Sequence, residues 1–217
     1  MTDKEHIEEI IKATFIVIKK VYKNNQKEDD NGCGSFCKSN SRIVFPRYRV
    51  KSNSGETRIS EQELRFIFIE QFYKHCQDKQ WNAYYSVETP TENKYVFSEN
   101  NKKILPRKAE EDKKEGQSAM VDLCIYDEKL NRIALIEFKA LNPDKHAFDK
   151  DLFKLKEERI ALTFFIMIVK SHGNGTITNI HKKIETKGDG TEFYCYDLEN
   201  EEDISKKIIE GISTSEK

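Results

Sequence analysis

Two carboxylates and a lysine lie within two short apolar segments, 119–126 and 133–140. Both segments have the aliphatic composition of β-strands, and the polar stretch between them is typical of a hairpin loop. If residues 128–131 form that loop, Asp122 on the first strand faces Glu137 on the second. Lys139 shares the face of Glu137, because side chains alternate along a strand. The pattern therefore predicts three charged side chains on one face of a hairpin.

The pairing of Asp122 with Glu137 indicates a bound cation. Directly opposite residues of an antiparallel pair lie about 5 Å apart, and like charges at that separation are destabilising. Burying such carboxylates is costly unless each is paired or binds a metal. Oxygen ligands suit a hard divalent ion such as Mg²⁺. Lys139 beside the ion can position a water or neutralise charge that develops on a phosphoryl group.

Two other interpretations of these residues stay open. A Glu-x-Lys sequence is common on a solvated edge strand, and a register shift of one residue would put Asp122 and Glu137 on opposite faces. The surrounding sequence favours the buried hairpin, since residues 133–136 are apolar on both faces. A helix and a second wholly apolar segment, 161–169, follow. We therefore expect the hairpin at the centre of a sheet.

The spacing resembles that of the PD-(D/E)XK nuclease superfamily, which has the restriction-endonuclease-like fold. Asp122 is followed, after fourteen residues, by Glu137-Phe138-Lys139 within an expected αβββαβ order. The resemblance covers residues 60–170. It departs from the family pattern before Asp122, where Met120-Val121 stands in place of the proline that gives the family its name.

A second likeness lies in the helix that precedes the expected sheet. Its opening, Glu61-Gln-Glu-Leu-Arg65, resembles the helix that begins the nuclease domain of type I restriction subunits and their relatives. In that helix a glutamate is followed four residues later by an arginine.

The resemblance implies a site, a cofactor and an activity. Asp122 and Glu137 would bind Mg²⁺ directly, with the Phe138 carbonyl as a further ligand, and Mn²⁺ would substitute. Lys139 would be the catalytic lysine, and Glu61 would complete the metal site directly or through water. The implied activity is that of a phosphodiester hydrolase, an endonuclease with DNA as the favoured substrate and a role in restriction or defence.

The residues themselves also point to Glu61. It lies three and seven positions before Leu64 and Phe68, which places it on the inner face of the helix. Glu63 is the rival, although its spacing from Ser60 is that of a capping box, which would give it a structural role. Glu61 is preferred for the site, although a glutamate in the first turn is also commonly only a partner of the helix dipole.

Contacts to nucleic acid would have to come from local basic groups, because the formal net charge is −1 and the chain has no overall basic excess. Arg47 and Arg49 flank the aromatic residue Tyr48. Lys102 and Lys103 lie in the polar stretch before the hairpin, and Lys154 lies on the helix that follows the hairpin. The candidate residues are Arg47, Arg49, Lys102, Lys103 and Lys154.

The periodicity of apolar residues predicts the elements that hold these side chains. Helices are expected at 3–22, 60–77, from 142 onward, 177–184 and 204–212, and strands at 81–87, 119–126, 133–140, 161–169 and 193–196. The polar segment 92–115 is expected to be a long loop. The predicted fold is α/β, with a mixed central sheet flanked by helices in a restriction-endonuclease-like αβββαβ core, plus an N-terminal helix. The chain is therefore expected to divide into two regions. Residues 1–41 would form an amphipathic helix and a polar linker, and residues 42–217 would form the nuclease domain.

Composition excludes several classes of protein. The 217 residues are 37% hydrophobic with 9 Gly and 4 Pro, which suits one core and not a collagen-like or Pro/Gly-rich disordered chain. No apolar run approaches the about 20 residues of a membrane span, so no membrane partner is expected. The odd number of five cysteines and the polar start of the chain predict a cytoplasmic protein.

The sequence thus supports two hypotheses on function. The first is a divalent-metal-dependent nuclease. The second is a catalytically inactive nuclease-fold protein that binds nucleic acid or protein. The N-terminal helix would pack on the body of the chain or, in the second case, dock a partner or a second copy in a homodimer. It would do so through its apolar stripe of Ile7, Ile11, Phe15 and Ile18.

Overall fold

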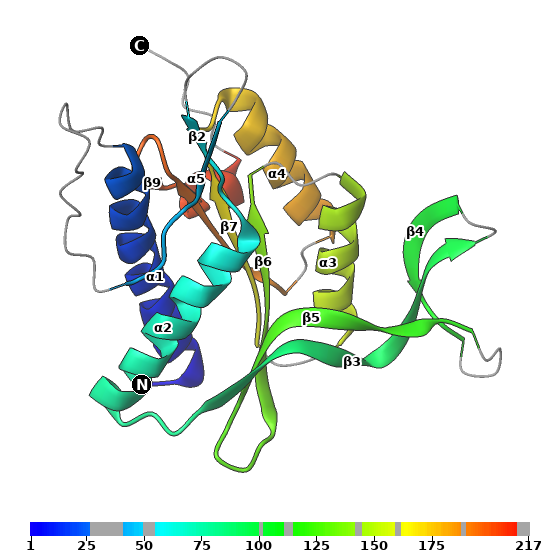
Figure 1. The fold of residues 1–217 in the computed structure, drawn as a ribbon. Coiled ribbons are helices and arrows are strands. Elements are labelled where there is room, and N and C mark those ends of the chain that lie inside the picture. Colours follow the sequence, from blue (N-terminus) through cyan, green and yellow to red (C-terminus); the bar gives the residue numbers. More distant parts are fainter. Residues whose placement is uncertain are drawn as a thin grey trace.

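The computed structural model describes residues 1–26, 41–49, 55–99, 102–110, 115–141, 145–158, 162–187 and 190–211. Within these residues, a mixed seven-stranded sheet carries helices on both faces (Figure 1). This confirms the predicted α/β class with a mixed central sheet and an N-terminal helix. Residues 27–40, most of the expected linker, lie outside the described residues. No helix in the described part of the chain is both long enough and apolar enough to cross a membrane.

The helices are α1 (Asp3–Gln26), α2 (Glu61–Lys79), α3 (Lys145–Glu157), α4 (Asn174–Lys187) and α5 (Ser205–Glu210). The strands are β1 (Arg47–Arg49), β2 (Gly55–Thr57), β3 (Tyr84–Glu99), β4 (Lys102–Lys108), β5 (Gln117–Tyr126), β6 (Arg132–Ala140), β7 (Leu162–Val169), β8 (Glu192–Asp197) and β9 (Glu202–Asp203). The sheet order is β4-β3-β5-β6-β7-β8-β9, and β1 pairs with β2 separately. Strands β6, β7 and β8 run parallel, and the other neighbours in the sheet are antiparallel.

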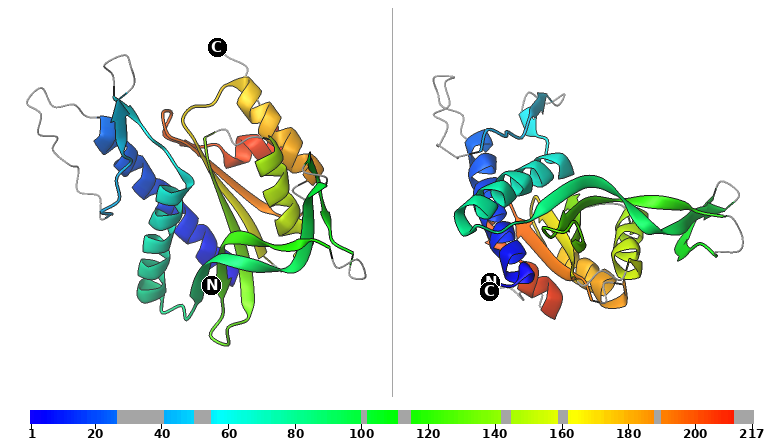
Figure 2. Two further views of the ribbon diagram at one scale, coloured as in Figure 1. Left: turned by 45° about the vertical axis from the view of Figure 1, so that its right-hand side comes forward. Right: turned by 90° about the horizontal axis from the view of Figure 1, so that it is seen from below.

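Different helices cover the two faces of the sheet (Figure 2). Helices α1 and α2 pack on one face, where Phe68 and Phe138 meet edge to face with ring centroids 5.4 Å apart. Helices α3, α4 and α5 pack on the other, where Phe148 lies against Phe165 at 4.8 Å. Each such fully buried side chain contributes about 1.5–3 kcal/mol to folding. The sheet is therefore buried on both faces, as the apolar runs of β6 and β7 predict.

The apolar stripe of α1 points into this core. Ile7, Ile11 and Ile18 have no exposed surface, and Phe15 is 4% exposed. The helix itself is confirmed, and of the two expected uses of its stripe, packing on the body of the chain or docking a partner, the structure shows the first. That the chain binds a partner or forms a homodimer stays a prediction.

Strands β3 and β4 differ from the elements expected in this part of the chain. The expected strand 81–87 and loop 92–115 are instead a 16-residue strand, β3, and its antiparallel partner β4. The two form an arm that projects beyond the helical layers (Figure 1). Much of β3 faces solvent, so its sequence is polar and lacks the alternation that marks a half-buried strand. Pro90 lies where the pairing of β3 with β5 shifts register, a position that tolerates proline.

A histidine pair joins α1 to α2. His6 Nδ1 lies 2.8 Å from His75 Nε2, and the His6 ring stacks on Trp81 with centroids 4.6 Å apart. Glu9 Oε2 is 3.8 Å from His75 Nδ1 and 3.3 Å from Lys79 Nζ. Burial lowers the pKa of both imidazoles, and the charge of His6 lowers that of His75 further.

This pair predicts a loss of stability in mild acid. A histidine whose pKa is lower in the folded chain binds its proton more readily when unfolded, so stability is full above the ordinary pKa of about 6.5 and falls as the pH drops below it. We expect urea unfolding to show a lower free energy of unfolding at pH 5.5 than at pH 7.5. His75→Gln should reduce that difference, and an unchanged difference in this variant would contradict the assignment.

Candidate active site

Asp122 and Glu137 lie where β5 and β6 stop pairing. The register of Leu123 with Ile136 and of Cys124 with Leu135 is the expected one, and the regular ladder ends there. One residue further, the Phe138 N–H donates a hydrogen bond to Asp122 Oδ2 at 2.8 Å. A side chain thus replaces the backbone partner at this point, and the carboxylate of Asp122 is fixed beside the strand that carries Glu137.

Glu137 is almost completely buried. Its side chain is 2% exposed, and its Oε1 lies 2.6 Å from the Nζ of Lys154. Burial raises the pKa of Glu137 well above its usual range, and the charges of Asp151 and Asp122 raise it further. An opposing cation is therefore needed to keep this carboxylate ionised.

Lys139 extends from β6 toward two carboxylates. Its Nζ lies 2.8 Å from Asp151 Oδ2 and 3.5 Å from Glu61 Oε1, and its side chain is 9% exposed. Burial opposes the charge of this lysine, but the nearby carboxylates, Asp151 first, outweigh burial and raise its pKa above the usual range. In this arrangement the group is an ammonium, a donor of hydrogen bonds and of positive charge.

Glu61, and not Glu63, reaches this region. As the first residue of α2, Glu61 places its half-exposed carboxylate near Lys139, and burial raises its pKa. Glu63 Oε2 instead accepts a hydrogen bond from the Ser60 hydroxyl. Ser60 is the N-cap residue, as expected, although its side chain makes no capping bond to the backbone.

Helix α3 supplies two residues that the sequence analysis did not place in the site. Asp151 Oδ1 lies 2.8 Å from Lys154 Nζ, so Asp151 bridges Lys154 and Lys139. The expected role of Lys154 as a surface contact to nucleic acid is wrong, because this residue is only 3% exposed. No local pattern marks them, since Phe148, Leu152 and Leu155 form an unbroken apolar stripe and both charged residues lie beside it.

Arg65 and Glu88 complete the arrangement on the α2 side. Arg65 Nη1 contacts Glu88 Oε1 at 2.5 Å and lies 3.8 Å from Asp122 Oδ1. Glu88 adopts a positive φ of 47° in β3, a backbone conformation that is uncommon for a non-glycine residue. Arg65 thus holds the carboxylate of Glu88 near that of Asp122.

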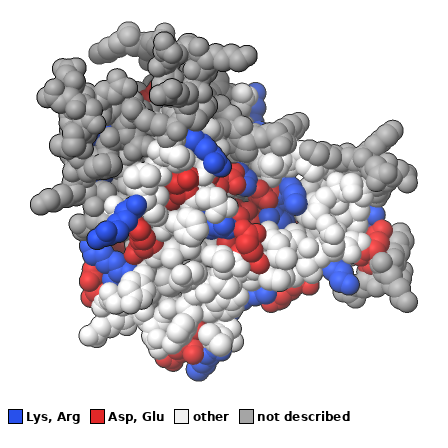
Figure 3. Space-filling model, viewed as in Figure 1, with Lys and Arg blue, Asp and Glu red and all other residues white. Residues whose placement is uncertain are grey.

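We call these residues the charged cluster. They come from α2, β3, β5, β6 and α3, and acidic and basic side chains gather over this part of the molecule in Figure 3. Five carboxylates face three cations, which leaves an excess of two negative charges when all are ionised. The members are Glu61, Glu88, Asp122, Glu137, Asp151, Arg65, Lys139 and Lys154.

The donor set fits a hard divalent cation in chemistry and in charge. All its acidic groups offer oxygen, which Mg²⁺ prefers, and the excess of two negative charges matches one such ion. Among the described residues, however, no group of three or more His, Cys, Asp or Glu side chains is arranged to hold a metal. The acidic residues that would hold an ion are Asp122 and Glu137, with the Phe138 carbonyl and Glu61 as the further oxygen donors.

The other basic candidates are not assembled with the cluster. The side chains of Arg47, Arg49, Lys102 and Lys103 lie outside the described residues; their backbone positions fall in β1 and β4. Their contacts to nucleic acid stay predictions.

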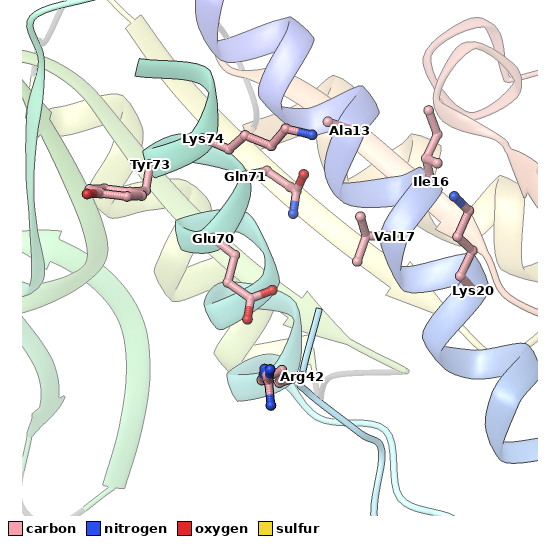
Figure 4. Close-up of a pocket in the computed structure, with 9 residues that line it drawn as sticks. All are labelled: Ala13, Ile16, Val17, Lys20, Arg42, Glu70, Gln71, Tyr73 and Lys74. Carbon is pink, nitrogen blue, oxygen red and sulfur yellow. The ribbon is translucent and has the colours of Figure 1, made fainter. Parts of the chain in front are cut away.

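A separate hollow of about 580 Å³ lies between α1 and α2 (Figure 4). It combines apolar side chains with three cations and one carboxylate, and it shares no residue with the charged cluster. Its lining is Ala13, Ile16, Val17, Lys20, Arg42, Glu70, Gln71, Tyr73 and Lys74. The hollow is therefore a site separate from the charged cluster.

Comparison of the chain with models of protein families, with curated proteins and with solved structures gave no match.

Proposed function

We propose that the chain is a divalent-metal-dependent nuclease with a restriction-endonuclease-like core. One observation carries the proposal. Asp122 accepts a hydrogen bond from the Phe138 N–H, between Glu137 and Lys139, where the pairing of β5 with β6 ends, and Glu61 reaches Lys139 from α2. The buried carboxylate of Glu137, the carboxylate of Asp122 that the Phe138 N–H holds, and the ammonium of Lys139 are groups suited to metal-assisted cleavage of a phosphodiester.

The order of elements supports the proposed core. Helix α2 is followed by β3, β5 and β6, then α3 and β7, which is the expected αβββαβ order with β4 as an addition to β3. The first three of these strands are antiparallel, and β7 lies parallel to β6. The proposed metal ligands lie on the central strands of the sheet, which holds them rigidly.

Each residue has a distinct part in the proposed reaction. A bound Mg²⁺ would polarise the scissile phosphate and lower the pKa of a water. Asp122 is oriented for binding by the Phe138 N–H. Lys139, held by Asp151 and Glu61, offers its ammonium to a phosphate oxygen and stabilises the negative charge that develops there. DNA as the substrate, and a role in restriction or defence, rest on the resemblance to the PD-(D/E)XK superfamily.

A plasmid-nicking assay tests the proposal. We expect supercoiled DNA to be cut in Mg²⁺ or Mn²⁺ and to stay intact in EDTA. Lys139→Met should slow cutting by about 100- to 1,000-fold, because it removes the positive charge next to the reacting phosphate. Lys129→Met, in the exposed loop of the β5–β6 hairpin, is the matched control and should keep the wild-type rate. Cutting that survives EDTA, or that Lys139→Met leaves unchanged, would refute the proposed site.

One observation favours a binding module as the alternative function. The acidic members of the charged cluster already have cationic neighbours, so the cluster does not need a metal to be stable. A folded chain that binds DNA in a gel-shift assay, but takes up no Mn²⁺ in calorimetry and cuts nothing, would establish this alternative.

A further inference from the structure

Lys154 has the surroundings of a bound cation. Its Nζ lies 2.6 Å from the Met120 carbonyl oxygen, 2.6 Å from Glu137 Oε1 and 2.8 Å from Asp151 Oδ1. An ammonium has three N–H donors and no acceptor; this one donates a hydrogen bond to the Met120 carbonyl and is paired in charge with the two carboxylates. The side chain is 4% exposed. This lysine is therefore committed to the interior and is not free to reach a phosphate.

The three oxygens resemble the ligands of a hard metal ion. Two are carboxylate oxygens and one is a backbone carbonyl, and they come from three elements, β5, β6 and α3. Oxygens lie about 2.3–2.6 Å from Ca²⁺ and about 2.0–2.1 Å from Mg²⁺. The spacing around Lys154 is only a few tenths of an ångström wider than a calcium site. The ammonium thus stands where a metal ion would otherwise neutralise Glu137 and Asp151.

Many enzymes that cleave phosphodiesters use two metal ions about 3.5–4 Å apart. Here Asp151 directs one oxygen at Lys154 and the other at Lys139, so both of its oxygens already have a cationic partner. Glu137 has one oxygen on Lys154 as well. The donors that remain for a metal are Asp122, the other oxygen of Glu137, the Phe138 carbonyl and Glu61. The excess of two negative charges in the charged cluster suits one divalent ion.

We propose that the Lys154 ammonium is a built-in cation that fills the position between Glu137, Asp151 and the Met120 carbonyl, so that the charged cluster takes one divalent ion and not two. The inference rests on the proposed function, since the one ion is the Mg²⁺ expected at Asp122 and Glu137. Lys154 is a positioning residue, because it acts through Glu137 and Asp151 and touches no substrate.

The test counts Mn²⁺ ions by isothermal titration calorimetry on the full chain. Wild type should bind one ion. Lys154→Ala should bind two, because it vacates the three oxygens and adds one negative charge to the excess. Lys154→Met keeps the length of the side chain and blocks the space, so it should bind one. Lys156→Ala, an exposed lysine on the same helix, is the surface control and should also bind one.

A structural role alone would not change the number of ions, so the gain of one ion in Lys154→Ala is the decisive readout. No gain, or two ions in wild type, overturns the inference, whatever the nicking assay shows. The proposed function fails separately, if wild type binds no ion at all. In that case a single ion in Lys154→Ala would still support the built-in cation.

Lys154→Ala leaves the buried carboxylate of Glu137 without its counter-charge and leaves Asp151 with Lys139 alone, so it is expected to be unstable in EDTA. Thermal unfolding followed by circular dichroism addresses this. We expect Mn²⁺ to raise the melting temperature of Lys154→Ala more than that of Lys154→Met. A Lys154→Ala chain that stays unfolded in saturating Mn²⁺ would overturn the inference.

Discussion

Replacing Asp122 with asparagine is expected to slow Mg²⁺-dependent nicking by at least about 100-fold while the chain stays folded. The amide oxygen of asparagine can still accept the hydrogen bond from the Phe138 N–H, which Asp122 accepts at 2.8 Å. Only the negative charge is lost, and with it one of the two proposed direct carboxylate ligands. The affinity for Mn²⁺, measured by calorimetry, should therefore fall together with the rate.

Glu128→Gln provides the comparison for this variant. Glu128 is exposed in the loop between β5 and β6, so the same loss of one negative charge there should change neither the rate nor the affinity for Mn²⁺. If Asp122→Asn bound Mn²⁺ and cut DNA as the wild type does, the metal would have to lie elsewhere. A far-ultraviolet circular dichroism spectrum equal to that of wild type shows that the fold is kept.

The largest expected effect on stability comes from Glu158, at the end of α3. Its carboxylate has no exposed surface and accepts hydrogen bonds from the Glu92 N–H at 2.8 Å, the Asn93 N–H at 3.1 Å and the Tyr95 hydroxyl at 2.6 Å. Glu158→Ala leaves these donors buried without an acceptor. We expect the free energy of unfolding, measured in urea, to fall by about 3–5 kcal/mol.

Glu157→Ala is the matched control for Glu158. The neighbouring residue contributes its backbone carbonyl, which accepts a hydrogen bond from Asn93 Nδ2 and remains in the variant. Its substitution should cost less than about 0.5 kcal/mol. Equal losses in the two variants would mean that the buried carboxylate does not hold β3 against α3.

The part of the site on β5 and β6 could be predicted because strand alternation and a short loop determine which side chains share a face. Asp122 therefore lies beside the strand that carries Glu137 and Lys139, although the regular ladder ends at Leu123 and Ile136, one pair before the expected pairing of Asp122 with Glu137. The contribution of α3 could not be predicted in the same way. Asp151 and Lys154 look like surface charges in the sequence, and only the packing of α3 on the sheet shows that they neutralise each other and Glu137 in the interior.

The fold was predictable where the core imposes a pattern and not elsewhere. Strands β6 and β7 are buried on both faces and have apolar sequences, so their bounds agree closely with the expected ones. The arm of β3 and β4 has few apolar residues, and its order comes from backbone pairing and from Glu158, which is more than fifty residues away in the sequence. Such long-range stabilisation leaves no local pattern.

The dependence of Glu137 on Lys154 couples the folding of two parts of the chain. Until α3 docks, the newly formed β5–β6 hairpin has no lysine from that helix to neutralise its buried carboxylate. Hairpin and helix should therefore open and close as one cooperative unit, with similar protection of their amides in native-state hydrogen exchange. A fragment that ends before residue 154 would contain both proposed metal-binding carboxylates and yet lack a stable strand to hold them.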